Sequence, residues 1–180
     1  MSCCSTAQKP GTKKWKRTSV ISLARKVDFM FEVVMGDILC ATTGYICHQV
    51  NCRNVMGSGV AKSIYTKYPE VKSEYHRFCS LAKSPYDLLG QAQIVPIEQA
   101  GISVINLFGQ LNYGRKSGVI YTDYQAMKNA LRKINRLCAG KSVAFPYGIG
   151  CGLAGGDWST VEKLIVQNLP DCNVKVYLNG

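Results

Sequence analysis

Two glycine-rich segments constrain this chain of 180 residues more than any other feature. The first runs from Val50 to Ala61 and the second from Phe145 to Trp158. Each follows an apolar run and precedes a pattern with helical spacing, which predicts two strand–loop–helix units. Glycine lets the backbone approach a ligand closely, and a loop that opens a helix presents unpaired N–H groups to an anion. The two loops therefore predict a site for a phosphate-bearing ligand. The alternative is that both are only tight turns.

Apolar periodicity predicts that strands and helices alternate along the chain. We expect a connection over residues 85–89, a loop over residues 109–118, and capping boxes at Thr122 with Gln125 and at Ser159 with Glu162. The alternation indicates a layered α/β domain, in which ligands bind beyond the carboxyl ends of the strands. The expected strands are residues 29–34, 45–50, 91–97, 102–108, 141–145 and 173–178, and the expected helices are residues 60–68, 69–78, 122–137 and 159–169.

The net charge of +11 is concentrated near the N-terminus, where seven lysines and arginines precede the first acidic residue, Asp28. Residues 1–27 have no sustained apolar period, so we predict a basic, solvated extension there and a single domain over residues 28–180. The alternative is that this tail steers the protein toward nucleic acid or another acidic partner.

The nine cysteines are an odd number and are scattered along the chain. They show no paired CxxC spacing for zinc, and we interpret them as reduced thiols, with Cys47, Cys138 and Cys172 as small core residues. No apolar stretch approaches the length of a membrane span. We expect a monomer without a metal or a cofactor, located in the cytoplasm, with the nucleus as the alternative.

Three motifs, in their order and spacing, resemble the macrodomain family over about residues 31–178. They are Gly36-Asp37-Ile38, the first glycine loop from Val50 to Ala61, and the run from Ile149 to Leu153. Their longer spelling looks like the bacterial and phage-type branch, which is allied to the terminal ADP-ribose protein glycohydrolases and to the yeast ADP-ribose-1''-phosphate phosphatase. The resemblance implies a three-layer α/β/α sandwich with a mixed central sheet that binds ADP-ribose.

The same resemblance assigns ligand contacts to positions of this chain. Asp37, beside Ile38, would accept a hydrogen bond from the adenine amino group, and Tyr177 would stack on the adenine. Asn51 would hold the distal ribose. The first loop would pass beneath that ribose and the diphosphate, and the second would wrap the diphosphate. The loop residues are Gly57, Ser58, Gly59 and Val60 in the first, and Ile149, Gly150, Cys151, Gly152 and Leu153 in the second.

Two residues are candidates for the chemistry. His48 lies where the yeast phosphatase has a histidine on the same strand, and it could act as a general acid or base. The alternative is a buried histidine satisfied by the backbone. Asp157 could orient or deprotonate a water near the distal ribose. Its alternative is a carboxylate that caps a helix N-terminus.

Two departures from the glycohydrolase pattern bear on the mechanism. Those enzymes use a nucleophilic lysine shortly after the fourth strand, where Gln110 is the nearest match and cannot form a Schiff base. Their aspartate after the Gly-Cys-Gly-Leu run is Ala154 here. Lys116 could reach in from the loop, or it could be a solvated surface lysine. We interpret the chain as a hydrolase of ADP-ribosyl groups on protein or nucleic acid, or of ADP-ribose-1''-phosphate. The alternative is a non-catalytic reader of ADP-ribose.

Overall fold

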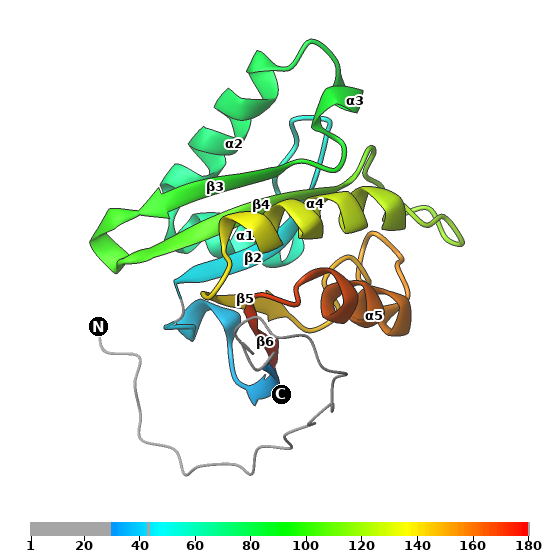
Figure 1. Ribbon diagram of the computed structural model, residues 1–180. Coiled ribbons are helices and arrows are strands. Elements are labelled where there is room, and N and C mark those ends of the chain that lie inside the picture. Colours follow the sequence, from blue (N-terminus) through cyan, green and yellow to red (C-terminus); the bar gives the residue numbers. More distant parts are fainter. Residues whose placement is uncertain (1–29, 43, 180) are drawn as a thin grey trace.

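The structure, a computed structural model, describes residues 30–42 and 44–179. A six-stranded sheet forms its centre, with the strand order β1-β6-β5-β2-β4-β3 (Figure 1). All neighbouring strands pair in parallel except β3 and β4, which are antiparallel, so the sheet is mixed, as expected. The strands are β1 (Phe31–Met35), β2 (Tyr45–Asn51), β3 (Ala92–Ile97), β4 (Ile102–Gln110), β5 (Ser142–Pro146) and β6 (Asn173–Leu178).

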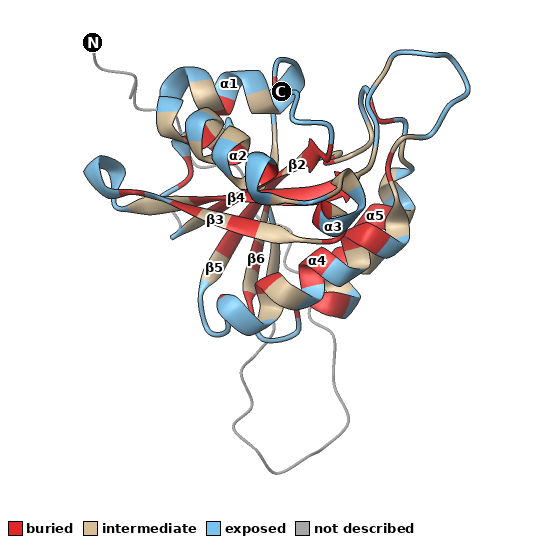
Figure 2. Ribbon diagram, turned by 90° about the horizontal axis from the view of Figure 1, so that it is seen from above, coloured by how far each residue is buried: buried red, intermediate tan, exposed pale blue. Residues whose placement is uncertain are grey.

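Helices cover both faces of the sheet and complete the predicted three-layer sandwich. Because side chains alternate across a strand, Ile46 and Cys47 of β2 enter different cores. Ile46 packs with the first two helices, and Cys47 packs with the last two. Figure 2 shows the buried strands between outer helix surfaces that are exposed. The helices are α1 (Gly59–Lys67), α2 (Pro69–Leu81), α3 (Pro85–Leu88), α4 (Tyr124–Leu137) and α5 (Trp158–Asn168), with short 3-10 turns η1 (Ile38–Cys40) and η2 (Glu98–Ala100).

Both predicted capping boxes in the second half of the chain are wrong. Helix α4 is capped by Asp123, whose carboxylate accepts from the backbone N–H of Ala126, because the Thr122 hydroxyl donates to the carbonyl of Gly150 instead. Helix α5 is capped by Asp157, which places Ser159 inside the first turn. In both helices the carboxylate, a strong capping group, occupies the cap and the hydroxyl bonds elsewhere.

Residues 85–88 form a short helix rather than the expected connection. Ser84 accepts from the backbone N–H of Tyr86, and Asp87 accepts from the backbone N–H of Ser84. This reciprocal cap, with Pro85 in the first turn, is enough to fix one helical turn.

Cys47, Cys138 and Cys172 are buried, as predicted, and the cysteines of the described ranges are free thiols. Among the described helices, none combines the length and the hydrophobicity that crossing a bilayer requires. The described residues also contain no group of three or more potential metal ligands. The predicted basic extension lies outside the described residues.

Candidate functional site

The carboxyl ends of β2, β4 and β5 open into a cavity of about 700 Å³. Three segments line it: the first glycine loop, the second glycine loop, and residues 111–123, which we call the β4–α4 loop. The volume is typical of a site for a small organic ligand. The structure therefore brings the two glycine loops together around one cavity.

Gly150 shows why the second loop needs glycine. Its φ of +75° is rarely adopted by other residues, and an added Cβ would lie 2.6 Å from Gln49 Oε1. The Gly150 carbonyl accepts from Thr122 Oγ1 at 2.6 Å and from the Gly156 N–H at 2.9 Å. The second loop is thus fixed against the β4–α4 loop and the end of β2.

Gln49 joins the end of β2 to β4 and to the β4–α4 loop. Its Nε2 donates to Gln110 Oε1 at 2.7 Å and to Thr122 Oγ1 at 3.0 Å. Gln110 in turn donates to the carbonyl of Asn112 at 2.9 Å. Gln110, at the position nearest to the glycohydrolase lysine, therefore lines the cavity as part of an amide network that holds the ends of β2 and β4 together.

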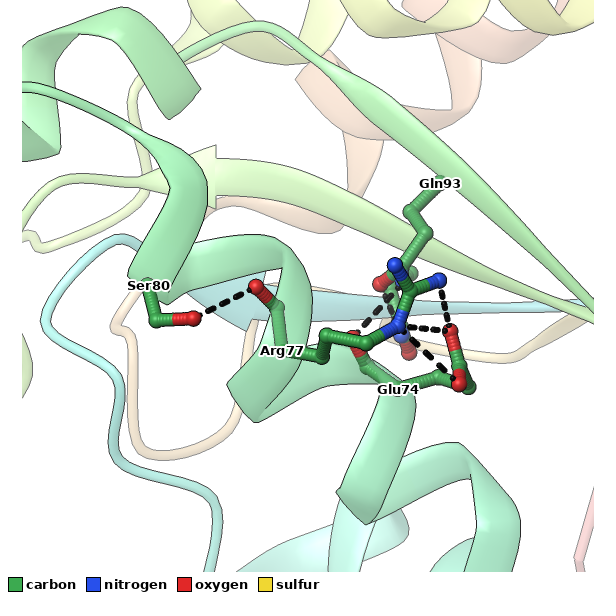
Figure 3. Close-up of polar contacts among 5 residues, drawn as sticks. Glu74, Arg77, Ser80 and Gln93 are labelled. Atoms are coloured by element: carbon green, nitrogen blue, oxygen red, sulfur yellow. Dashed lines mark hydrogen bonds and ion pairs between the residues drawn. The ribbon is translucent and has the colours of Figure 1, made fainter.

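A row of buried polar side chains crosses the sheet at His48. The strand register places His48 beside Asn106 of β4, and Asn106 beside Gln93 of β3. His48 Nε2 lies 2.6 Å from Asn106 Oδ1, Asn106 Nδ2 donates to Gln93 Oε1 at 2.9 Å, and Gln93 Nε2 donates to the backbone carbonyl of Glu74 in α2 at 2.9 Å. Figure 3 shows the end of the row, where Gln93 meets Glu74.

The direction of this row fixes the tautomer of His48. A backbone carbonyl can only accept, so the Gln93 amide must donate to Glu74 and accept from Asn106. Asn106 must then present its oxygen to His48, and Nε2 of the imidazole carries the proton. Nδ1 is then an unprotonated acceptor. It is one of two buried side-chain nitrogen or oxygen atoms without a hydrogen-bond partner in the described residues, and the other is Gln49 Oε1.

His48 is uncharged at neutral pH. Its side chain is 1% exposed, and burial lowers its pKa from 6.5 to about 4 against the smaller opposing effect of the hydrogen bond to Asn106. The alternative of a buried histidine satisfied by the backbone is met only in part, because the imidazole is buried but its partner is the side chain of Asn106. His48 is among the residues that line the cavity, and its Nδ1 is a buried acceptor without a partner in the described residues.

Asn51 lies at the end of β2 and lines the same cavity. Its Nδ2 donates to the Val55 carbonyl at 2.5 Å, its Oδ1 accepts from the Arg53 N–H at 2.9 Å, and its backbone carbonyl accepts from the Tyr75 hydroxyl at 2.9 Å. These bonds fold residues 51–55 into a tight turn. They hold the Asn51 amide in one orientation and leave its second N–H as the group to offer a ligand.

Asp157 has the capping geometry that was the alternative to a catalytic role. Its Oδ2 accepts from the Ser159 hydroxyl at 2.7 Å, and from the hydroxyl and the backbone N–H of Thr160, each at 2.8 Å. These bonds, led by that of Ser159, lower its pKa from 3.8 to about 2. Asp157 is outside the set of residues that line the cavity.

The residues expected at the adenine lie at the edge of the sheet. Asp37 caps η1 by accepting from the Leu39 N–H at 2.9 Å, and Ile38 and Tyr177 belong to one hydrophobic cluster. The Tyr177 carbonyl accepts from the N–H of Tyr147, which lines the cavity. The structure thus groups Asp37, Ile38 and Tyr177 beside the cavity but outside its lining. Cys151 is also outside the lining. The expected residues that line it are His48, Asn51, Gly57, Ser58, Gly59, Val60, Ile149, Gly150, Gly152 and Leu153.

Comparison with known proteins decides the family. Residues 47–165, about two thirds of the chain, match the Macro domain family. The chain belongs to this family. The match covers both glycine loops and the whole row from His48 to Asn106.

Individual macrodomains show the same relationship. The chain is 30% identical over 147 residues to the DNA ADP-ribosyl glycohydrolase of Mycobacterium tuberculosis, and it spans 40% of the length of that relative. The macrodomain of Mycobacterium tuberculosis DarG superposes with a TM-score of 0.67 and 30% identity, over 83% of this chain and 97% of that one. A Bacteroides thetaiotaomicron protein of unknown function gives a TM-score of 0.73 and 25% identity, over 83% of this chain and 98% of that one.

Sequence reasoning missed three polar residues of this macrodomain site. Gln49, Gln93 and Asn106 each lie within an apolar run that was assigned to a strand. A lone amide in a buried strand is costly unless it is paired, and this was the available signal. Their partners depend on strand register, which periodicity does not supply.

Proposed function

We propose that this macrodomain binds ADP-ribose in the cavity and hydrolyses ADP-ribosyl groups at C1'' of the distal ribose, with nucleic acid as the carrier of the group. The observation that carries the proposal is the buried, unpartnered acceptor of His48 in a residue that lines the cavity. The 30% identity to a DNA ADP-ribosyl glycohydrolase supports both the chemistry and the carrier.

The ligand pose we propose combines the contacts that the resemblance assigns with the strand order. The parallel strands β1, β6, β5, β2 and β4 end at the same side of the sheet. The adenine would lie at the β1–β6 edge between Asp37 and Tyr177, and the diphosphate would lie across β5 against the backbone N–H groups of the glycine loops. The distal ribose would then reach β2 and the second N–H of Asn51.

The reaction we propose is attack of a water oxygen on C1''. The bond from C1'' to the nucleic acid breaks, its electron pair leaves with the nucleic acid, and that leaving group takes up a proton. The water gives one proton to a base as it bonds to C1''. Nδ1 of His48 is our candidate for this base because the Asn106 bond fixes the ring and places the proton on Nε2, which leaves Nδ1 as the acceptor.

Asp157 is our second candidate for directing the water. It lies at the end of the second loop, but its carboxylate already accepts from Ser159 and Thr160. Because these bonds go to Oδ2, Oδ1 is the oxygen with which Asp157 could direct a water. Replacing Asp157 with serine, which can cap the helix but has no carboxylate, separates the capping role from a role in the reaction.

A non-catalytic reader is the second candidate function. Gln110 supports it, because an amide held in a hydrogen-bond network replaces the nucleophilic lysine of the glycohydrolases. A reader would bind ADP-ribose with the same residues and release nothing.

One experiment separates the two functions. The purified protein is incubated with an ADP-ribosylated oligonucleotide, an ADP-ribosylated protein and ADP-ribose-1''-phosphate, and released ADP-ribose is measured for each, beside calorimetry with ADP-ribose. Release from the oligonucleotide supports the hydrolase. ADP-ribose binding without any release supports the reader. No binding of ADP-ribose at millimolar concentration would refute both.

A further inference from the structure

The mouth of the cavity carries positive charge and no negative charge. Residues 51–61, 110–118 and 146–154, which form its rim, contain no aspartate or glutamate. Of the cations in these segments, Arg115 lines the cavity, and Arg53 and Lys116 lie outside its lining. A rim of this kind favours a ligand with more negative charge than one diphosphate, because exposed cations attract a polyanion over several ångströms.

Arg53 follows the cavity-lining residue Asn51 by two positions and lies outside the lining itself. Its backbone N–H is bonded to Asn51, and its Nε donates to Asn112 Oδ1 of the β4–α4 loop at 2.6 Å. The guanidinium therefore bridges the first glycine loop and the β4–α4 loop at the surface. Within residues 30–42 and 44–179, no carboxylate is in salt-bridge contact with Arg53 or Arg115, the ion pair found there being Glu74–Arg77.

An exposed aromatic ring lies beside these cations. Tyr113, in the β4–α4 loop between Asn112 and Arg115, lines the cavity and is 53% exposed. An aromatic ring between arginines is the arrangement that stacks on a nucleobase and contacts the neighbouring phosphates. A peptide carrier offers no comparable flat partner to this ring unless it carries an aromatic residue.

A second hollow, of about 310 Å³, is lined in part by Cys52, Arg53 and Asn54 of the 51–55 turn. It is lined by Arg53 and Lys83 among neutral residues that include Ser84. Asp87, the nearest acidic residue along the chain, accepts from the Ser84 N–H. Arg53 thus belongs to the second hollow, together with a further cation, and its backbone N–H is bonded to Asn51, which lines the first.

We infer that these residues form a binding site for the nucleic-acid strand that carries the ADP-ribosyl group, an inference that rests on the proposed function. We call Arg53, Lys83, Tyr113 and Arg115 the strand-exit patch. Tyr113 stacks on a base next to the modified nucleotide, Arg53 and Arg115 contact the phosphates on either side, and Lys83 contacts a phosphate further along. The patch selects a single strand of several nucleotides over a modified amino-acid side chain.

The test measures binding, so that it does not depend on turnover. Affinities of the full chain are compared for ADP-ribose, an ADP-ribosylated mononucleotide, an ADP-ribosylated single strand of about twelve nucleotides, and an ADP-ribosylated peptide. The patch variants are Tyr113→Ala and the double variant Arg53→Gln with Arg115→Gln. The matched control is Lys141→Gln with Lys163→Gln, two exposed lysines at the start of β5 and on α5.

We expect the wild type to bind the long strand at least about ten-fold more tightly than the mononucleotide adduct. Both patch variants should lose most of that advantage. The double variant should also make the slope of log affinity against log salt shallower by about 1.4, the value for two phosphate contacts to a single strand. ADP-ribose affinity and melting temperature are measured for each variant, and the loss of affinity for the strand should exceed any loss of affinity for ADP-ribose. The control pair should bind the strand as the wild type does.

Equal affinity for the strand and the mononucleotide adduct would overturn the inference. Patch variants that bind the strand like the wild type would also overturn it, because other basic residues would then make the contact. Tighter binding of the peptide, lost in the patch variants, would assign the patch to a protein carrier and overturn it too. If ADP-ribose itself fails to bind, the proposed function fails. If ADP-ribose binds but the patch variants bind the strand like the wild type, only this inference is refuted.

Discussion

The buried neutral imidazole of His48 makes the stability of the domain depend on pH in a way that can be calculated. The folded-state pKa is about 4, against 6.5 for an ordinary histidine in the unfolded chain. Between these two values the unfolded state binds a proton that the folded state does not. Stability from this residue is therefore complete above about pH 6.5 and is lost as pH falls toward the folded-state pKa.

The size of the effect follows from the linkage relation. Lowering the pH from about 7 to about 5 covers roughly 1.5 units below the unfolded pKa, and each unit is about 1.4 kcal/mol, so His48 should lower the free energy of unfolding by about 2 kcal/mol. The full difference between the two pKa values would amount to about 3 kcal/mol at still lower pH. Since His48 is fully buried, little of this is lost to solvent screening.

The matched variant is His48→Gln, which keeps an amide N–H for Asn106 and does not titrate. Urea unfolding of both proteins is measured at about pH 7, 6 and 5, and the difference in unfolding free energy between them is plotted against pH. His76 and all carboxylates are common to both proteins and cancel. The wild type should lose about 2 kcal/mol more than the variant over this range. Parallel curves would show that His48 is protonated or solvated in the folded protein, and the tautomer assignment would then be wrong.

Three further predictions concern the rest of the site. Asn106→Leu removes the acceptor for His48 Nε2 and should lower kcat on the preferred substrate by about ten-fold or more while ADP-ribose affinity changes little; an unchanged kcat would show that the row of polar side chains does not contribute to the reaction. Gly150→Ala should weaken ADP-ribose binding and lower the melting temperature, because its Cβ meets Gln49, whereas Gly152→Ala, whose Cβ meets no protein atom within 4 Å, should leave the melting temperature unchanged; equal losses in thermal melts would contradict the loop geometry. Asp157→Ala should melt at a lower temperature, and Asp157→Ser should restore the melting temperature by capping again; if turnover is restored too, Asp157 acts only as a cap.

The sequence was sufficient for the fold because each strand is a distinct apolar run and each glycine loop separates a strand from a helix. The resemblance to macrodomains, which the family match confirms, predicted the three-layer arrangement of helices and sheet. Cap positions were harder to predict. Thr122 and Asp123 are both good caps, and the choice depends on a contact between Thr122 and Gly150, residues that are 28 positions apart.

The polar row at His48 could not be predicted for a similar reason. His48 and Asn106 are 58 positions apart and become neighbours only through the β2–β4 register. The candidate loops could be found because glycine spacing is local. The residues that orient His48 could not, because their role exists only once three strands are aligned. Roles at Asp37 and Tyr177 remain predictions of the resemblance, which the grouping of these residues at one sheet edge supports.

The central claim is that His48 Nδ1 faces the reaction rather than the protein interior. Single-turnover release of ADP-ribose from an ADP-ribosylated oligonucleotide, measured for the wild type and for His48→Gln, tests it most directly. The variant should bind ADP-ribose within a few-fold of the wild type, and its rate of ADP-ribose release should fall by a factor on the order of 10², since glutamine cannot take up the proton of the attacking water. A variant that releases ADP-ribose at the wild-type rate would contradict the account.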